Sequence, residues 1–418
     1  MKVDVYPSKV SGSITPPPSK SFLHRAIISA CLAKGRSTIN NIILSDHVLA
    51  TVNAFKSLGV QININDNSFG ITSNGYESFN KDIEVDCNES GSTIRFLIPI
   101  LSNDNFAYFK GKTSLINRPF NVYEDIFKKQ GLMFYKSGDN IITKGQLSPG
   151  KYIVPGDISS QFISGLLFIL PLLNGDSTIE IVGDFESKQY VDMTVNILKR
   201  FGVNITKNKN IFYIKKNQKY VSTSITAEID YSQMAFFAVL GTINNGIKIM
   251  GLSDYSMQPD RKIIDIIDLM GGKVKKDHNS INIYKSKTYG ITIDVSQSPD
   301  IAPILGVLAA SSYGTTNLVN AKRLIIKESN RLLSIYNTLI KFGVKIDLGE
   351  DLLKIDGPSK FKSNVFDSYN DHRIVMMIAI AATIAKDKVT IKGAEAVKKS
   401  YPNFFQDLEK LGVKIKYL

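Results

Sequence analysis

Cysteine is scarce in this chain of 418 residues, and long apolar runs are missing. The two cysteines, Cys31 and Cys87, are too few for a disulfide framework or a cysteine-rich metal site. The longest apolar segments, 162–173 and 374–385, are well short of the roughly 20 residues that a bilayer span needs. The opening MKVDVYPSKV has no apolar core of the kind found in signal peptides. We therefore expect a cytoplasmic protein with reduced thiols and no membrane partner.

The chain also lacks a balancing number of acidic residues. It has 51 Lys and Arg against 38 Asp and Glu, a formal net charge of +13. Such an excess favours an anionic partner, which could be a nucleic acid, a membrane phosphate or a small phosphorylated metabolite. With 43% apolar residues the composition is globular, and the length predicts two domains rather than one core.

One short pattern recurs six times at nearly constant spacing. Each copy is an amphipathic stretch that ends in a glycine and continues into a short apolar run. The glycines are Gly59, Gly131, Gly202, Gly272, Gly343 and Gly412, separated by 72, 71, 70, 71 and 69 residues. Glycine commonly ends a helix because it adopts the left-handed conformation of the cap. The six copies account for the whole chain and indicate one repeated building block.

The third copy shows this block most clearly. Its predicted elements are a strand over 151–154, a helix beginning at 159–161, a strand over 177–182, a helix ending at Gly202, and strands over 203–206 and 211–215. The order is βαβαββ, so the fold class is α/β. The first helix of each copy is apolar nearly all round, which predicts burial on every side. Three copies around one centre would place three buried helices inside and their sheets outside.

Two breaks in the chain separate the six copies into two groups of three. The run TPPPSK, 15–20, carries three prolines, and a polar segment spans 217–226. We predict one domain over residues 19–225 and a second from residues 1–18 plus 226–418.

Polar residues gather where the six buried helices are expected to begin. These starts are 19–21, 90–93, 159–161, 230–232, 299–300 and 371–373. Free amide groups and the positive end of the helix dipole make each start a potential anion site. Ser, Thr and Asp are also ordinary N-caps, which is the alternative explanation at any single start.

Cations accompany these helix starts, where their charge opposes the dipole. They are Lys20, Arg25, Arg95, Arg118, Lys188, Lys327, Arg331, Arg373 and Lys399. Their position suggests that a bound anion compensates them, and arginine suits carboxylate and phosphate through paired hydrogen bonds.

Nine segments spread along the chain resemble the 5-enolpyruvylshikimate-3-phosphate (EPSP) synthases, a family of enolpyruvyl transferases. They are PPSKSFLHRA, NESGSTIRFLIP, INRPF, ISSQFISGLL, SKQYVD, SPDIAPILGVLAA, IKESNRL, NDHRIVM and KKSYPNFF. The resemblance implies a two-lobed inside-out α/β barrel of six βαβαββ units, three per lobe, with the active site in the cleft between the lobes.

The activity that the resemblance implies is transfer of the enolpyruvyl group of phosphoenolpyruvate to the 5-hydroxyl of shikimate 3-phosphate. Phosphate is released, and the reaction proceeds by addition and elimination through a tetrahedral intermediate. This step belongs to the shikimate pathway, which supplies chorismate and the aromatic amino acids. The family also implies inhibition by glyphosate, no metal or organic cofactor, and a monomer whose partners are its two substrates.

The resemblance assigns roles residue by residue. Asp300 would hold and deprotonate the hydroxyl, while Glu328 and Lys20 would handle protons at the enolpyruvyl carbon. The ligands of shikimate 3-phosphate would be Lys20, Ser21, Arg25, Ser159, Ser160, Gln161, Ser187, Tyr190, Asp300 and Lys327. The ligands of phosphoenolpyruvate would be Lys20, Gly91, Arg118, Gln161, Arg331, Arg373 and Lys399. The simpler alternatives are an N-cap for Asp300 and a surface ion pair for Glu328.

Three positions depart from the usual family pattern: Asn88, Ser92 and Asn330. Asn330 replaces a usual aspartate and so removes a charge that could steer Arg331 or Lys327. One rival function is that of a UDP-N-acetylglucosamine enolpyruvyl transferase, which typically carries a cysteine in a loop matching 112–120, where this chain has none. The other rival is a repeat-built nucleic-acid binding protein, which would spread its basic residues along a face with stacking aromatics.

Overall fold

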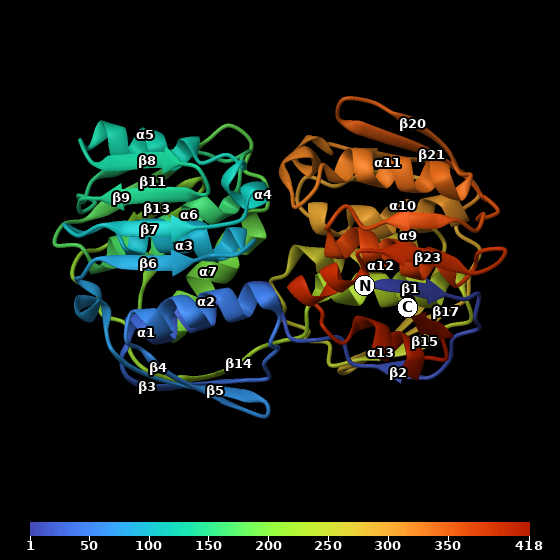
Figure 1. Ribbon diagram of the computed structural model, residues 1–418, viewed down its shortest axis with the longest axis horizontal. Coiled ribbons are helices and arrows are strands. Elements are labelled where there is room, and N and C mark those ends of the chain that lie inside the picture. The colour runs from blue at the N-terminus through green and yellow to red at the C-terminus, as the bar shows by residue number, and fades with distance from the viewer. The chain divides into compact units, whose positions relative to one another are not determined.

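The computed structural model describes residues 1–418 and divides into two compact units (Figure 1). Unit 1 consists of Met1–Pro17 and Glu228–Leu418, and unit 2 of Pro18–Ala227. In Figure 1 unit 2 runs from blue to green, and unit 1 from yellow to red with the dark blue N-terminal residues added. The chain therefore leaves unit 1 after its first strands and returns to it after residue 227.

Unit 2 contains three four-stranded sheets. In spatial order their strands are β14 (Ser224–Thr226), β3 (Lys34–Asn40), β5 (Ser68–Asn74) and β4 (Gln61–Asn65); β6 (Ile83–Asp86), β7 (Ala107–Lys110), β9 (Asn140–Lys144) and β8 (Met133–Ser137); and β10 (Lys151–Pro155), β11 (Ser177–Val182), β13 (Ile211–Ile214) and β12 (Ile205–Asn208). The helices are α1 (Lys20–Leu32), α2 (Asp46–Ser57), α3 (Gly91–Ile100), α4 (Thr113–Ile116), α5 (Asn121–Lys129), α6 (Ser160–Ile169) and α7 (Lys188–Arg200).

Unit 1 contains three further four-stranded sheets. Their strands are β2 (Ser13–Ile14), β15 (Ile247–Met250), β17 (Ser280–Tyr284) and β16 (Lys273–Asp277); β18 (Thr292–Asp294), β19 (Gly314–Val319), β21 (Leu352–Gly357) and β20 (Lys345–Leu348); and β22 (Val365–Asp367), β23 (Val389–Lys392), β1 (Lys2–Val5) and β24 (Ile415–Tyr417). The helices are α8 (Tyr231–Ile243), α9 (Ile263–Leu269), α10 (Ala302–Ser311), α11 (Arg331–Phe342), α12 (His372–Ala382) and α13 (Phe404–Lys410), with short 3-10 turns η4 (Pro299–Ile301), η5 (Lys322–Ile326) and η6 (Ala394–Lys399).

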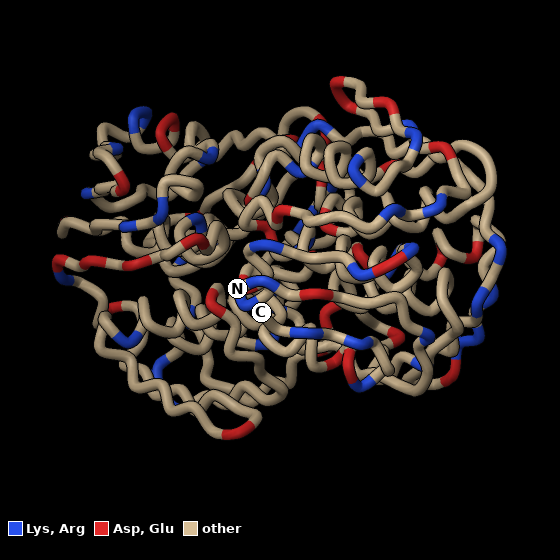
Figure 2. The backbone as a smooth tube through the Cα atoms, turned by 45° about the vertical axis from the view of Figure 1, so that its right-hand side comes forward, with Lys and Arg blue, Asp and Glu red and all other residues tan.

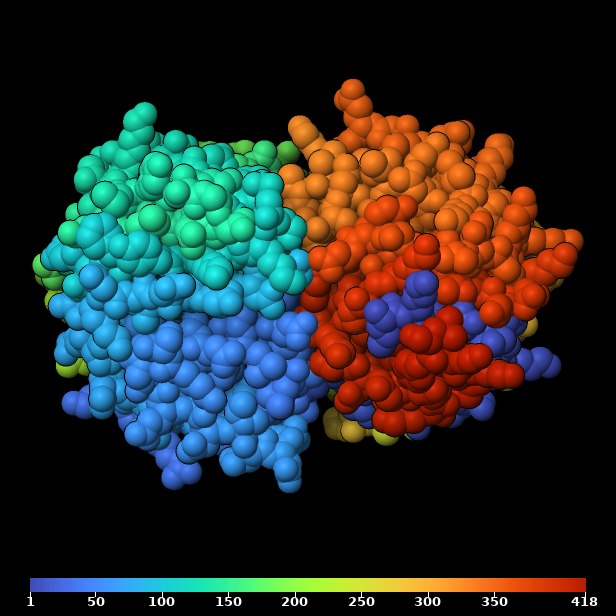
Figure 3. Space-filling model, viewed as in Figure 1, coloured from blue at the N-terminus to red at the C-terminus, as the bar shows by residue number.

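Every sheet is built to one plan, which confirms the predicted α/β block. The first two strands are parallel and the other two pair antiparallel, as in β10, β11, β13 and β12. In four of the sheets a buried helix joins the two parallel strands directly along the chain. Three blocks borrow a strand from a distant part of the chain. β14 pairs with β3, β2 pairs with β15, and β1 lies between β23 and β24. Figure 3 shows the last case, where dark blue N-terminal atoms lie among the red C-terminal ones.

The first helix of each block is buried almost completely, as its all-round apolar sequence predicts. In unit 2, α3 packs against α6 and also contacts α1, and in unit 1, α10 packs against α8 and α12. Gly165 shows how closely α6 approaches α3, because a Cβ atom there would lie 2.5 Å from the carbonyl oxygen of Arg95. None of the helices combines the length and hydropathy of a bilayer span.

Two local predictions need correction. The left-handed glycine of the fourth block is Gly271, with φ of 90°, and not Gly272. Gly272 is required for a different reason, because a Cβ atom there would lie 2.4 Å from Ile267 Cγ2. The polar segment 217–226 is not wholly a break, because its last residues form β14. In the third block, the strand predicted at 203–206 lies at Ile205–Asn208.

Candidate active site

The structure confirms that polar residues lie at the predicted helix starts in both units. Ser19, Ser90 and Ser159 cap α1, α3 and α6 through hydroxyl oxygens that accept backbone N–H groups. In unit 1 the carboxylates of Asp230 and Asp371 cap α8 and α12 in the same way. Since three buried helices of unit 2 and two of unit 1 begin with polar caps, the free amides at these starts provide the donors that an anion requires.

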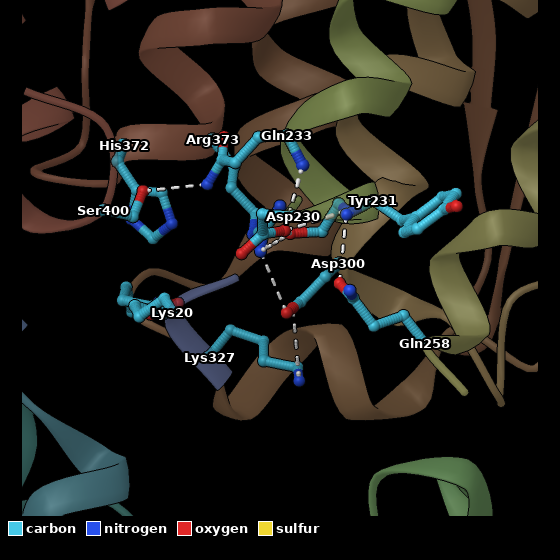
Figure 4. Close-up of polar contacts among 12 residues, drawn as sticks. Lys20, Asp230, Tyr231, Gln233, Gln258, Asp300, Lys327, His372, Arg373 and Ser400 are labelled. Carbon is cyan, nitrogen blue, oxygen red and sulfur yellow. Dashed lines mark hydrogen bonds and ion pairs between the residues drawn. The ribbon is translucent and has the colours of Figure 1, made fainter. Parts of the chain in front are cut away.

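In unit 1 three cations surround the carboxylate of Asp300, and Figure 4 shows two of them, Lys327 and Arg373. Arg331 Nη1 lies 2.8 Å from Oδ1, Arg373 Nη2 lies 3.0 Å from Oδ2, and Lys327 Nζ lies 3.6 Å from Oδ1. Asp300 stands in η4, where it makes no capping bond to α10. The alternative explanation of Asp300 as an N-cap is therefore wrong.

The surroundings of Asp300 set its protonation state. Burial alone would raise the pKa of its carboxyl, but Arg373, Lys327 and Arg331 outweigh burial and hold the pKa well below its ordinary value. Burial lowers the pKa of Lys327 to about 8, against the opposing attraction of Asp300. Asp300 is thus an ionised carboxylate at neutral pH, whereas Lys327 loses its charge only slightly above it.

Arg331 is enclosed by carboxylates. Its Nε lies 2.8 Å from Asp371 Oδ2, its Nη2 contacts Glu328 Oε2, and only 1% of its side chain is exposed. Burial would lower the pKa of this guanidinium, but Asp371, Glu328 and Asp300 together raise it. Glu328 therefore forms an ion pair, as its simpler alternative expected, but the pair is largely buried, since 13% of the Glu328 side chain is exposed. Such a set is costly to break, because removing one member leaves a buried charge uncompensated.

Asp371 connects two of the predicted ligands. Besides Arg331 it accepts a hydrogen bond from the hydroxyl of Ser329 at 3.1 Å, and its Oδ1 accepts the backbone N–H of Arg373 at 2.9 Å. Asp371 is fully buried. A single carboxylate thus caps α12 and orients the arginine that begins α11.

Arg373 has donors that the protein does not use. Its Nη2 donates to Ser232 Oγ at 2.9 Å and to Asp300, whereas Nε and Nη1 are buried without a hydrogen-bond partner. Ser232 is held by Asp230, whose Oδ1 also caps α8. Nearby, Lys399 Nζ donates to the carbonyl of Asn370 at 2.6 Å.

In unit 2 the start of α3 faces a second group of cations. A Cβ atom on Gly91 would lie 3.1 Å from Arg118 Nη1, 3.4 Å from Arg95 Nη1 and 3.6 Å from Gln161 Oε1. Gln161 accepts from Arg95 at 2.8 Å and donates to Ser92 Oγ at 2.9 Å. Arg118 Nε is buried without a partner. Backbone amides and guanidinium groups therefore converge on the space beside Gly91.

A third group of polar residues surrounds Arg25 on α1. Its Nε donates to Thr194 Oγ1 at 2.7 Å, and its other nitrogens reach the carbonyls of Ser21 and Tyr190 and the hydroxyl of Ser164. Burial lowers the pKa of this guanidinium to about 10. It nevertheless stays charged at neutral pH, and no carboxylate of its own unit pairs with it.

Four other predicted ligands lie near the starts of unit 2 helices. Ser187 begins α7 in the left-handed region, with φ of 52°, a conformation that a non-glycine residue adopts only where its surroundings hold it. Ser160 is the first residue of α6, and Ser159 caps it. Lys20 is the first residue of α1, and its Nζ lies 3.5 Å from His47 Nδ1 on α2.

Two expectations about charge change in the light of these contacts. Lys327, Arg331 and Arg373 do not depend on a bound anion for compensation, because Asp300, Glu328 and Asp371 already pair with them. The departure at Asn330 does not release Arg331 or Lys327, because Asn330 is exposed and its Oδ1 caps α11 by accepting from Leu333 N. An aspartate at 330 would cap the helix in the same way.

Sequence analysis missed several residues that orient the predicted ligands. Thr194 and Ser164 hold Arg25, and Asp371 holds Arg331. Asp371 stood at a recognised helix start, so its position was the available signal. Thr194 gave only a weak signal, a hydroxyl on the buried side of the otherwise apolar stripe of α7.

Comparison with known proteins adds independent findings. A family model described as EPSP synthase (3-phosphoshikimate 1-carboxyvinyltransferase) matches residues 5–408. The chain is 45% identical to the 3-phosphoshikimate 1-carboxyvinyltransferase of Clostridium novyi (strain NT), covering 98% of this chain and 97% of that protein. It is also 45% identical to the enzyme of the same name from Clostridium kluyveri, covering 99% and 98%.

Solved structures agree with the sequence relatives. An EPSP synthase from Acinetobacter baumannii matches with a TM-score of 0.83 and 25% identity, covering 100% of both chains. The enolpyruvyl transferase NikO from Streptomyces tendae matches with a TM-score of 0.82 at 16% identity, covering 100% of this chain and 98% of that one, and so shares the fold. These matches agree with the predicted inside-out α/β barrel class.

Proposed function

The chain belongs to the EPSP synthase family, and from this premise we propose that it transfers the enolpyruvyl group of phosphoenolpyruvate to the 5-hydroxyl of shikimate 3-phosphate. The family match over residues 5–408 favours this reaction over the UDP-amino-sugar alternative. The nucleic-acid alternative is weaker, because acidic residues lie among the basic ones and the basic residues form no single stripe (Figure 2).

One observation carries the proposal for the site. Arg118 Nε, Arg373 Nε and Arg373 Nη1 are buried donors without a partner in the protein. Leaving a charged donor unpaired costs free energy, so residues with several such donors are suited to bind an anion. We assign phosphoenolpyruvate to these arginines together with Lys20, Gly91, Gln161, Arg331 and Lys399.

Shikimate 3-phosphate is assigned to the groups around Arg25. Arg25 and Ser21 would bind its carboxylate, whereas Ser159, Ser160 and Ser187 would bind its phosphate beside Tyr190. Gln161, Lys20, Lys327 and Asp300 would contact the ring or its hydroxyls. Support comes from the placement of Ser159 and Ser160 at the start of α6, where free amides favour a phosphate.

The proposed addition step balances as follows. The 5-hydroxyl oxygen bonds to C2 of phosphoenolpyruvate, its proton passes to Asp300, and the methylene carbon takes a proton from Glu328 or Lys20. Elimination then removes a proton from the resulting methyl group and breaks the bond between C2 and the phosphate oxygen. Inorganic phosphate leaves, and the enol ether remains on the former hydroxyl.

The electrostatics of unit 1 suggest how Asp300 becomes a base. While Arg373, Lys327 and Arg331 face it, the pKa of Asp300 stays low, and a low pKa makes a weak base. A phosphate and a carboxylate arriving at the same cations would neutralise their field. Substrate binding would then raise the pKa of Asp300 and allow it to accept the hydroxyl proton.

The test is a turnover assay that measures phosphate release and the enol ether product. We expect both products in equal amounts when shikimate 3-phosphate and phosphoenolpyruvate are supplied together. No release with this pair, but release with UDP-N-acetylglucosamine, would overturn the assignment. We also propose a cytoplasmic monomer, which sedimentation would support by giving a mass near 46.3 kDa.

A further inference from the structure

A chain of four buried polar side chains runs through unit 2 behind the start of α3. His24 Nδ1 lies 2.7 Å from Thr51 Oγ1, Thr51 Oγ1 lies 2.7 Å from Thr93 Oγ1, and Thr93 Oγ1 donates to Ser90 Oγ at 2.7 Å. All four residues are fully buried. His24 lies on α1, Thr51 on α2 and Thr93 on α3, whose N-cap is Ser90, so the chain connects three helices.

The direction of every hydrogen bond in this chain follows from counting protons. Thr93 gives its only hydroxyl proton to Ser90, so it can only accept from Thr51. Thr51 therefore spends its own proton on Thr93 and can only accept from His24. His24 must carry its proton on Nδ1, and its Nε2 must be an unprotonated nitrogen.

The surroundings of His24 agree with this tautomer. Its Nε2 is buried without a hydrogen-bond partner, so an N–H there would be an unsatisfied donor. Burial lowers the pKa of the imidazole well below its ordinary value, and the nearby charges of Lys20 and Arg25 lower it further. His24 is therefore neutral, with one donor that is already used.

The far end of the chain is the turn that we assign to phosphoenolpyruvate. Ser90 Oγ accepts the backbone N–H of Thr93 at 3.2 Å and so fixes the first turn of α3, which begins at Gly91. The near end lies on α1, which carries the proposed ligands Lys20, Ser21 and Arg25. A hydroxyl relay of fixed direction thus sets the Gly91 amide in a defined place relative to these side chains.

From this geometry we infer that His24, Thr51 and Thr93 are positioning residues for anion binding at the start of α3. They touch no substrate and act through Ser90 on the Gly91 amide. The inference rests on the proposed function for the identity of the anion. The alternative is that the chain only satisfies polar groups in the core and has no effect on the site.

The decisive comparison is Thr51→Val with Thr51→Ser. Valine keeps the volume of the threonine side chain but cannot hydrogen-bond to His24 or Thr93, whereas the serine hydroxyl can make both bonds. Thr143→Val is the matched control, because Thr143 is another fully buried threonine of unit 2 whose Oγ1 has no partner. The measurements are the Kd of an unreactive phosphoenolpyruvate analogue by calorimetry in the presence of shikimate 3-phosphate, the KM of phosphoenolpyruvate in the turnover assay, the Kd of inorganic phosphate, and Tm.

We expect Thr51→Val to weaken phosphoenolpyruvate binding by about fivefold to tenfold, the scale of one lost hydrogen bond. Thr51→Ser and Thr143→Val should remain within about twofold of the unchanged protein, on the same scale. Equal Kd values for Thr51→Val and Thr51→Ser, or an equal loss in Thr143→Val, would overturn the inference. If the unchanged protein shows no turnover but Thr51→Val still weakens phosphate binding, the proposed reaction fails while the positioning role stands.

A second measurement determines the tautomer of His24 in the unchanged protein and uses a variant only to identify its signals. Nitrogen NMR of 15N-histidine distinguishes the two tautomers of each of the four histidines, and His24→Asn identifies the His24 signals by their loss. We expect the Nδ1–H tautomer at His24. An Nε2–H tautomer would contradict the direction of the chain and with it the inference.

Discussion

Replacing Asp300 by alanine separates binding from chemistry at the proposed site. In unit 1 the carboxylates of Asp300, Glu328 and Asp371 balance the charges of Lys327, Arg331 and Arg373. In the unchanged protein Arg331 Nη1 and Arg373 Nη2 donate to Asp300. Removing the Asp300 carboxylate leaves one net positive charge and frees these two donors for an anion. We therefore expect anion binding to survive while turnover is lost.

The magnitudes can be worked from this arrangement. Loss of the group that accepts the hydroxyl proton should lower kcat by about a hundredfold or more, roughly 2.7 kcal/mol of barrier. For an assumed separation of about 8 Å from a bound anion and an effective dielectric constant of about 40, one added positive charge strengthens anion binding by on the order of 1 kcal/mol. The KM for phosphoenolpyruvate should therefore stay level or fall by up to about fivefold.

Steady-state phosphate release at varied phosphoenolpyruvate, with calorimetry for shikimate 3-phosphate, measures both effects. Asp356→Ala is the matched control, because Asp356 pairs with Lys345 at 2.8 Å on the surface of the same unit, and it should leave kcat and KM unchanged. Near-normal turnover in Asp300→Ala would remove Asp300 from the mechanism. A large rise in KM would refute the charge balance from which the prediction starts.

Three further predictions follow from single contacts or pKa values. Gly91→Ala should raise both the KM for phosphoenolpyruvate and the half-inhibiting glyphosate concentration by about tenfold, because the added alanine Cβ would lie 3.1 Å from Arg118 Nη1. Inhibition kinetics that give an unchanged KM would count against this prediction. The pKa of about 8 at Lys327 predicts that kcat/KM for shikimate 3-phosphate falls as the pH rises through 8, because the Lys327 ammonium loses its charge. In the Lys327→Arg variant the pH profile should no longer show this fall, because arginine stays charged. Because the pKa of His24 is lowered in the folded protein, His24 takes up a proton on unfolding below pH 6.5. Between pH 7.5 and 5.5 the free energy of unfolding should therefore fall by about 1 kcal/mol more in the unchanged protein than in His24→Asn. Denaturant titrations that give the same fall for both proteins would be inconsistent with a buried neutral imidazole.

The repeated block could be predicted because its signals are local. A glycine after an amphipathic helix and a polar cap before an apolar one are both written within a few residues, and five of the six helix-ending glycines were identified correctly. The sixth failed because Gly271 and Gly272 are adjacent and both are needed. Gly271 takes the left-handed conformation that turns the chain, whereas Gly272 allows the close packing against Ile267, and only this packing shows which glycine does which.

The partners of the site residues could not be predicted from local pattern. Arg331 and Asp371 are 40 residues apart, and Arg25 and Thr194 are 169 apart, so only the fold brings them into contact. The helix starts indicated where cations would gather but not that carboxylates would compensate those of unit 1. Charge at a helix start is visible in a sequence, whereas the group that neutralises it usually comes from another element.

The most direct test of the central claim is a crystal structure with shikimate 3-phosphate and an unreactive analogue of phosphoenolpyruvate. The account predicts density for two anions, one within hydrogen-bonding distance of Arg118 Nε and Arg373 Nη1, and a ring hydroxyl within reach of the Asp300 carboxylate. Anions bound instead at the exposed lysines of residues 209–219, with those arginine donors still unpaired, would contradict it.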